Sequence, residues 1–171
     1  GEALGGHFHA LARGEDTRAV VPDQQRKSVG RETTFIEDLR DRAAVRRTLL
    51  ELVEEVTRRL RRAGLRGQIL HVKLHWPIFR TFPRQERLPE PADTTDAIWP
   101  TAERLLARAD DGRQAIRLVG VSVSHFDARP QLALFDPPAA ARARRVARAV
   151  DALAERFGRD VVQRGAVRRR P

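Results

Sequence analysis

The sequence lacks cysteine, methionine and tyrosine, and Lys27 and Lys73 are its only lysines. Without cysteine the chain can form neither a disulfide framework nor a thiolate metal site, which fits a reducing compartment. It contains no apolar run of roughly 18 residues that could span a membrane, and no signal segment opens it. We therefore expect a cytoplasmic protein without membrane contact. The missing methionine leads us to expect that the chain is part of a longer protein.

Arginine supplies nearly all of a formal net charge of +10, and the isoelectric point is near 11.5. A basic excess of this size is typical of proteins that bind a polyanion. Hydrophobic residues make up 41% of the 171 residues, which is enough for one packed domain with extensions.

The spacing of apolar residues predicts alternating strands and helices. Strands are predicted at about 27–35, 68–76, 81–88 and 115–124, and helices at about 42–63 and 94–109. This β-α-β-β-α-β order predicts an α+β fold of the ferredoxin-like type, a four-stranded sheet with both helices on one face. Flanking helices are expected at about 1–13 and 139–157. Asp93 is expected to cap the second helix, in which Pro100 predicts a kink or a later start.

Strand alternation predicts which face of the sheet is left open. Leu70, Val72, Leu74 and Trp76 share one side of their strand, whereas the polar residues between them share the other. The polar set over the whole sheet comprises Ser28, Gly30, Lys73, His75 and Ser122. An uncovered, partly basic face of this kind can lie against a nucleic-acid backbone.

No catalytic or metal site is predicted within the chain. A two-metal mechanism needs converging carboxylates, and Asp110-Asp111 is one of few adjacent acidic pairs. It directly precedes Gly112, so we interpret it as a turn. The five histidines do not show the spacing of metal ligands.

Several segments taken together resemble one known family. Lys27–Phe35, followed by Asp38, is similar to the opening of the little-finger domain of Y-family DNA polymerases, most closely the DinB or DNA polymerase IV branch. Further segments agree in register: Arg59–Arg61, Gly64–Gly67, Lys73-Leu74, Phe79–Thr81 and Arg117–Ser124. Upstream, Ala12–Arg18 with Val20–Pro22 is similar to the end of the family's thumb and its linker.

The resemblance implies a division of the chain into five parts. These are the end of a thumb-like helical region (1–14), a linker (15–26), a little-finger DNA-binding domain (27–127), a clamp-binding peptide (128–137) and a basic helical C-terminal extension (138–171). The resemblance also implies a monomer whose parent is an error-prone translesion DNA polymerase, a nucleotidyltransferase. The palm carboxylates and the magnesium ions that they hold would lie outside this chain, which itself would hold no cofactor.

The implied role of this part is to grip the backbone of duplex primer–template DNA. The residues that the resemblance and the strand pattern nominate for DNA contact are Ser28, Gly30, Arg31, Thr34, Lys73, His75, Thr81, Arg84, Arg117 and Ser122. The sequence departs from the family in the central hairpin, where His75 replaces a second basic residue and Ile78 an acidic one. Arg117 has the parity of the core-side valines, which places it at the start of its strand instead.

The pentapeptide Gln131-Leu132-Ala133-Leu134-Phe135 falls where the family carries its sliding-clamp-binding motif. The resemblance implies that Gln131, Leu132, Leu134 and Phe135 bind the clamp, with Leu134 and Phe135 as apolar anchors and Gln131 as a hydrogen-bonding one. A strand end with a core Leu and Phe is the alternative interpretation of the same residues.

Two other classes of protein fit the sequence. The parent could be a catalytically inactive Y-family-like adaptor of a mutagenesis complex. Alternatively, the chain could be a free-standing nucleic-acid-binding module. Aromatic residues are scarce on the expected open face, which disfavours base stacking of the kind that RNA-binding modules use.

Overall fold

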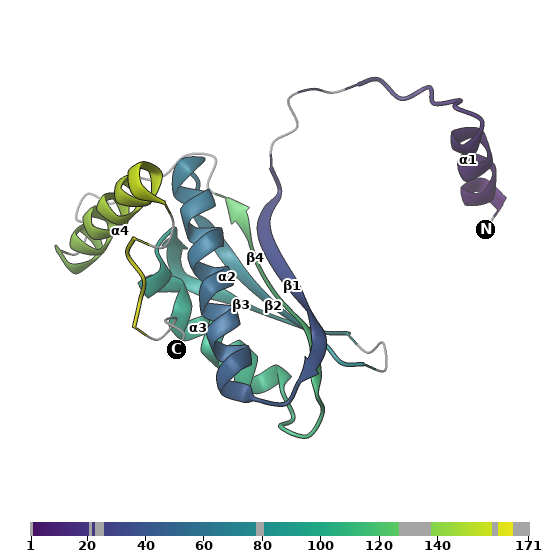
Figure 1. The fold of residues 1–171 in the computed structure, drawn as a ribbon. Helices are drawn as coiled ribbons and strands as arrows, with labels where there is room; N and C mark the ends of the chain where they lie inside the picture. The colour runs from purple at the N-terminus through teal and green to yellow at the C-terminus, as the bar shows by residue number, and fades with distance from the viewer. Residues whose placement is uncertain are drawn as a thin grey trace.

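The computed structural model describes residues 2–20, 22, 26–77, 81–126, 138–158 and 161–165. Its centre is a four-stranded antiparallel sheet in the order β1-β4-β2-β3 (Figure 1). The strands are β1 (Ser28–Leu39), β2 (Gly67–His75), β3 (Thr81–Ala92) and β4 (Ile116–Phe126). Because β4 pairs antiparallel with both β1 and β2, these two run parallel with β4 between them. This is a split β-α-β arrangement, and it confirms the predicted α+β fold.

Two helices, α2 (Arg42–Arg62) and α3 (Thr95–Ala109), cover one face of the sheet (Figure 1). Asp41 caps α2 by accepting a 2.8 Å hydrogen bond from the backbone N–H of Ala43. Gly64, at φ 64°, lets the chain turn sharply after the helix. The core lies between this helical layer and the sheet, and its fully buried members include Leu49, Val53, Leu60, Leu70, Val72, Leu74, Ile98, Leu105 and Val119.

Two local predictions concern α3. The helix begins at Thr95 and includes Pro100, so of the two outcomes predicted for Pro100 the later start does not occur, and the kink stays a prediction. Pro100 removes only one backbone N–H, and burial of Ile98 and Leu105 holds the helix against the sheet. Thr94 occupies the N-cap position in place of Asp93, without a side-chain capping bond.

The strand β3 is longer than predicted and continues through Pro89 and Pro91 to Ala92. Proline is tolerated here because β3 pairs only with β2 and is an edge strand of the sheet. A prolonged β3 also brings its end beside the start of β2, where Gly67 pairs with Ala92.

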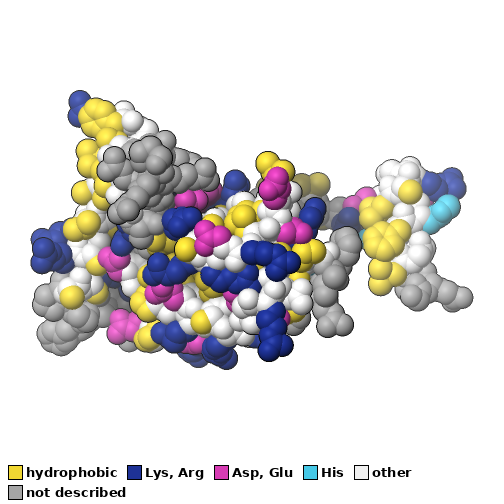
Figure 2. Space-filling view, turned by 60° about the horizontal axis from the view of Figure 1, so that its bottom comes forward, with side chains coloured by type: hydrophobic (Ala, Val, Ile, Leu, Met, Phe, Trp, Pro, Cys, Tyr) yellow, Lys and Arg dark blue, Asp and Glu magenta, His cyan; other side chains and the backbone are white. Residues whose placement is uncertain are grey.

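Two helices flank the sheet domain, α1 (Glu2–Ala12) and α4 (Pro138–Phe157). Figure 1 shows α1 apart from the sheet and α4 beside the C-terminal end of α2. On the face that it displays, Figure 2 shows basic and acidic side chains interspersed. Ion pairs between such groups join α2 to α3 and the turn after it, as between Arg46 and Glu103 and between Arg42 and Asp110. None of the helices in the described residues is long and apolar enough to cross a bilayer.

Candidate nucleic-acid interface

The face of the sheet opposite α2 and α3 carries a shallow hollow floored by small residues. Gly30 on β1 pairs with Ser122 on β4, and Gly120 lies between Glu32 on β1 and Lys73 on β2. A Cβ atom built on Gly30 would lie 2.6 Å from the Cβ of Ser122, so no larger residue fits this position without movement. The hollow has a volume of about 500 Å³. A phosphate group could therefore approach the strands closely, as backbone recognition requires.

Lys73 lines this hollow from β2, and its ammonium group is paired. Its Nζ lies 3.0 Å from Oε2 of Glu32, two strands away across Gly120. The two side chains remain 42% and 53% exposed. An ion pair this exposed is weak, so an incoming anion can compete for the lysine.

Arg59 reaches the rim of the hollow from α2. Its Nη1 donates a 2.7 Å hydrogen bond to the carbonyl oxygen of Gly30 on the edge strand β1. The bond occupies a backbone acceptor that an edge strand would otherwise leave open to another chain. It also places a guanidinium group beside the open face, although α2 packs on the other side of the sheet.

His71 adds a titratable group next to Lys73. Its Nε2 lies 3.0 Å from Oγ of Ser124, which in turn lies 3.4 Å from Nδ1 of His125. Burial lowers the pKa of His71, and the neighbouring imidazole of His125 lowers that pKa further. His71 is therefore biased toward its neutral form, and the cationic charge of the hollow comes from lysine and arginine.

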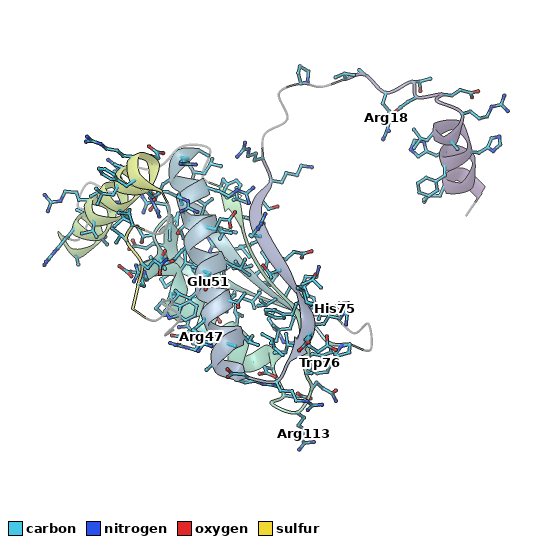
Figure 3. The ribbon with its side chains drawn as sticks, viewed as in Figure 1. Arg18, Arg47, Glu51, His75, Trp76 and Arg113 are labelled. Carbon is cyan, nitrogen blue, oxygen red and sulfur yellow. The ribbon has the colours of Figure 1, made fainter. Side chains whose placement is uncertain are left out.

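Most of the predicted DNA-contacting residues do lie on the open face. Cross-strand register places Thr34 opposite Leu118, which in turn pairs with His75, and Thr81 opposite His75. Figure 3 shows His75 near the end of β2, well away from Arg47 and Glu51 on α2. With the residues of the hollow, the open face brings together Ser28, Gly30, Thr34, Lys73, His75 and Ser122.

Three predicted basic contacts do not have the strand parity of the open face. Arg31 pairs in register with the core-side Val121, and its Nε lies 3.7 Å from Oε2 of Glu55 on α2. Arg84 pairs in register with the buried Val72, so it too belongs to the helical side of the sheet.

Arg117 follows the buried Ile116 at the start of β4 and forms a 3.1 Å ion pair with Asp38. Neither Arg84 nor Arg117 lines the hollow, whereas Arg31 does, although its guanidinium group is paired with Glu55. For Arg31 and Arg84 the prediction overlooked strand alternation, which turns every second side chain toward the helices. For Arg117 the core-side parity was recognised from the sequence.

The sequence-based prediction also missed residues that the structure adds to the open face. Glu32 and Gly120 have the parity of Gly30 and Ser122, so alternation could have found them. Arg87 pairs with Ile69, which has the parity of His71 and Lys73. Its position depends on the register of the β2–β3 pair, which the sequence does not fix.

The acidic pair Asp110-Asp111 is structural, as predicted. Oδ1 of Asp110 accepts the backbone N–H of Gly112 at 3.0 Å, and Oδ1 of Asp111 accepts that of Arg113 at 2.9 Å. Asp110 is further bound by Arg42, at 2.8 Å. In the part of the chain that the structure describes, no group of three or more His, Asp or Glu residues could hold a metal ion. These residues therefore do not fit the magnesium ions implied for the parent.

The predicted clamp-binding residues Gln131, Leu132, Leu134 and Phe135 lie outside the described residues. Their assignment stays a prediction. The domain boundaries proposed from the sequence also stay predictions.

The strand order and the antiparallel pairing place the chain among α+β domains of the split β-α-β class. Residues 26–134 match the impB/mucB/samB family C-terminal domain. The chain therefore belongs to this family.

Relatives with a known name extend the match over most of the chain. It is 35% identical over 167 residues to DNA polymerase IV 1 of Mesorhizobium japonicum, covering 95% of this chain and 37% of that protein. It is 35% identical over 162 residues to DNA polymerase IV of Caulobacter vibrioides, covering 94% and 40%. The chain thus spans about two fifths of the length of these relatives.

Solved structures share the fold. The chain resembles a Y-family DNA polymerase chimera of Dbh and Dpo4, with a TM-score of 0.53, 20% identity, and coverage of 74% of this chain and 36% of that one. It also resembles a chain from a complex of the β-clamp processivity factor and the little finger domain of PolIV. There the TM-score is 0.50 at 24% identity, with 63% of this chain and 96% of that one covered. These similarities confirm the fold expected from the sequence.

Proposed function

We propose that the chain is the DNA-gripping little-finger part of a translesion DNA polymerase of the DNA polymerase IV type. One observation carries the proposal: the sheet face that the helices leave open holds a hollow floored by Gly30, Gly120 and Ser122, with Lys73 at its side. The 35% identity to proteins named DNA polymerase IV supports the same role. The polymerase active site and its magnesium ions would belong to the parent outside this chain.

The hollow would bind duplex DNA through its phosphates. Small residues allow a phosphodiester to approach the strands, and Lys73 and Arg59 bring positive charge to it. Contacts of this kind position a protein on DNA without reading its bases. A polymerase that must extend any primer terminus needs sequence-independent attachment of this kind.

The chain would also tether its parent to the sliding clamp through residues 131–135. Tethering raises the effective concentration of the enzyme at the primer without strengthening its contact with DNA. A neighbour of the same fold was solved together with a β-clamp, which supports this assignment. The proposed role places the protein in the cytoplasm, as a monomer.

The exposed apolar face of α1 fits a chain that continues upstream. Leu4 and Phe8 are 60% and 59% exposed, one turn apart on the helix. In a thumb-like helical region this face would pack against preceding helices.

Because the polymerase active site would lie outside this chain, the isolated chain should bind DNA but incorporate no nucleotide under any metal condition.

Duplex binding by the full chain tests the proposal. Fluorescence anisotropy with two 20-base-pair duplexes of different sequence should give similar affinities that fall steeply with salt. Lys73→Ala should weaken both about three- to tenfold and lower the slope of log affinity against log salt by about 0.9.

Arg47→Ala is the matched control. Arg47 lies on α2 in the helical layer (Figure 3). Its replacement by alanine removes the same single charge from the other side of the domain. Its affinity for DNA should stay within about twofold of the wild-type value, since only long-range charge is lost. An Arg47→Ala loss as large as that of Lys73→Ala would contradict an interface on the open face.

A further inference from the structure

The hollow on the open face contains its own anion. Among the described residues that line it, Glu32 is the only carboxylate, and it is bound to the ammonium group of Lys73 at 3.0 Å. The other cations near the hollow are already engaged. Arg59 donates to the carbonyl oxygen of Gly30 at 2.7 Å, and Arg31 faces Glu55 on the helical side.

The contact between Glu32 and Lys73 depends on the residue between them. Their strands are not neighbours, because β4 lies between β1 and β2. Gly120 is the β4 residue in register with both. A Cβ atom at this position would lie 2.9 Å from the Cβ of Glu32 and 3.5 Å from its Oε2. A side chain on residue 120 would therefore stand where the carboxylate now meets the lysine.

We propose that Glu32 is a built-in competitor for the DNA phosphate at Lys73, and that it sets how tightly the open face holds duplex DNA. This inference rests on the proposed function. In the free protein, the carboxylate holds the lysine across the sheet. When a phosphodiester enters the hollow, it must take the ammonium group from Glu32 or share it, and the remaining carboxylate repels the phosphate.

The competition favours a grip that holds and releases. Both members of the pair are about half exposed, so the pair itself is weak and exchanges readily. A lysine ammonium is a compact charge with three donors, and it can pass from one oxygen to another without a fixed geometry. A domain that must slide with each added nucleotide gains from an anion that lowers the affinity at every phosphate.

Neutralising Glu32 tests the proposal on the full chain. Glu32→Gln keeps the shape of the side chain and should tighten duplex binding about three- to tenfold at low salt, because it removes both a weak ion pair and a like-charge repulsion. The control is Glu37→Gln, which removes the same charge from an exposed position of the same strand. This control should change the affinity less than about twofold, as expected for a screened charge.

A double-mutant cycle shows whether Glu32 acts through Lys73. In a Lys73→Ala background, Glu32→Gln should lose most of its effect. An equal gain in both backgrounds would overturn the proposal, because it would show a general charge effect. If wild-type chain binds duplex DNA and Lys73→Ala weakens it, yet Glu32→Gln changes nothing, the competitor role fails while the proposed function stands. If the wild-type chain binds no duplex, the proposed function itself fails.

The two lysines of the chain permit a direct observation. Reductive methylation with ¹³C leaves lysine charge in place and labels only Lys27, Lys73 and the chain's amino terminus. The Lys73 methyl signal should shift when duplex DNA is added and, in the free protein, when Glu32 is changed to Gln. If the chemical shift of the Lys73 methyl signal does not change on Glu32→Gln, the ion pair does not exist in solution.

Discussion

Arg61 and Asp151 form a two-pronged ion pair that joins α2 to α4. Nε of Arg61 lies 2.7 Å from Oδ2 of Asp151, and Nη2 lies 2.9 Å from its Oδ1. The third donor, Nη1, binds the backbone oxygen of Asp93 at 2.7 Å. Only 11% and 16% of the two side chains are exposed, so this pair is better shielded than the neighbouring Arg62–Glu155 pair, whose side chains are 52% and 56% exposed.

The segment after α4 adds a second attachment. Arg164 contacts Glu54 on α2 at 2.9 Å and Asp96 in the first turn of α3 at 2.8 Å. Burial raises the pKa of Glu54 even though Arg164 lies beside it. Within the described part of the C-terminal extension, α4 and Arg164 are therefore attached to the helical layer by ion pairs.

Arg61→Ala should release α4 from the domain. The variant leaves Asp151 partly buried without its partner, so the free energy of unfolding should fall by about 1–3 kcal/mol. Urea unfolding measures this, and hydrogen exchange should show α4 losing protection first. Arg62→Ala, which breaks the exposed pair with Glu155, is the control and should cost less than about 0.5 kcal/mol. Equal losses in the two variants would contradict a special role for Arg61.

Gly67→Ala should destabilise the sheet. A Cβ atom on Gly67 would lie 2.1 Å from Cγ1 of Val123 and 3.1 Å from the backbone oxygen of Ser124. Overpacking at such a site costs about 1–3 kcal/mol, which thermal unfolding would detect as a lower Tm. Gly5→Ala is the control: nothing lies within 4 Å of a Cβ at this position in α1. It should leave Tm unchanged or raise it slightly, since alanine favours a helix.

The free energy of unfolding should decrease as the pH is lowered, partly because of His71. The folded-state pKa of His71 lies below its ordinary value of 6.5, chiefly because of burial and then because of His125. The unfolded chain therefore binds this proton at a higher pH than the folded chain, so stability is complete above about pH 6.5 and declines below it. Unfolding free energies at pH 7.5 and 5.5 measure the decline. His71→Gln should reduce the difference between the two values, whereas an unchanged difference would assign it to other groups.

The clamp assignment has a matched control within the chain. A Leu134→Ala, Phe135→Ala double variant should abolish binding to a sliding clamp, because apolar anchors carry most of such an interface, and should leave duplex affinity unchanged. Leu4→Ala with Phe8→Ala removes the same two side chains from the exposed face of α1 and should leave clamp binding intact. Surface plasmon resonance on immobilised clamp compares them. Undiminished clamp affinity in the first variant would refute the peptide assignment.

Sequence patterns predicted the elements of the sheet domain well because the patterns are local. The alternation through β2 correctly placed Leu70 and Val72 in the core and Lys73 on the open face. The spacing of apolar residues correctly predicted the helix at about 42–63, which is α2. Local propensity was less reliable for α3, where tertiary burial outweighed the effect of Pro100.

The candidate site was predicted only in part, since a site on a sheet depends on register. Arg31 and Arg84 were placed on the DNA face for their charge, but edge-strand pairing turns both toward the helices. Arg87 was overlooked because no local signal gives the register of β3 on β2.

By itself, the sequence determined the order of strands and helices, the division between core and polar faces, and the basic character of the chain. These follow from the periods of strands and helices and from composition, which need no knowledge of distant contacts. Tertiary structure alone decided that β4 separates β1 from β2. It thereby brought Glu32 and Lys73 together across Gly120 and attached α4 to α2 through Arg61. The physical reason is that strand order and register are set by long-range pairing and burial, which no short stretch of sequence specifies.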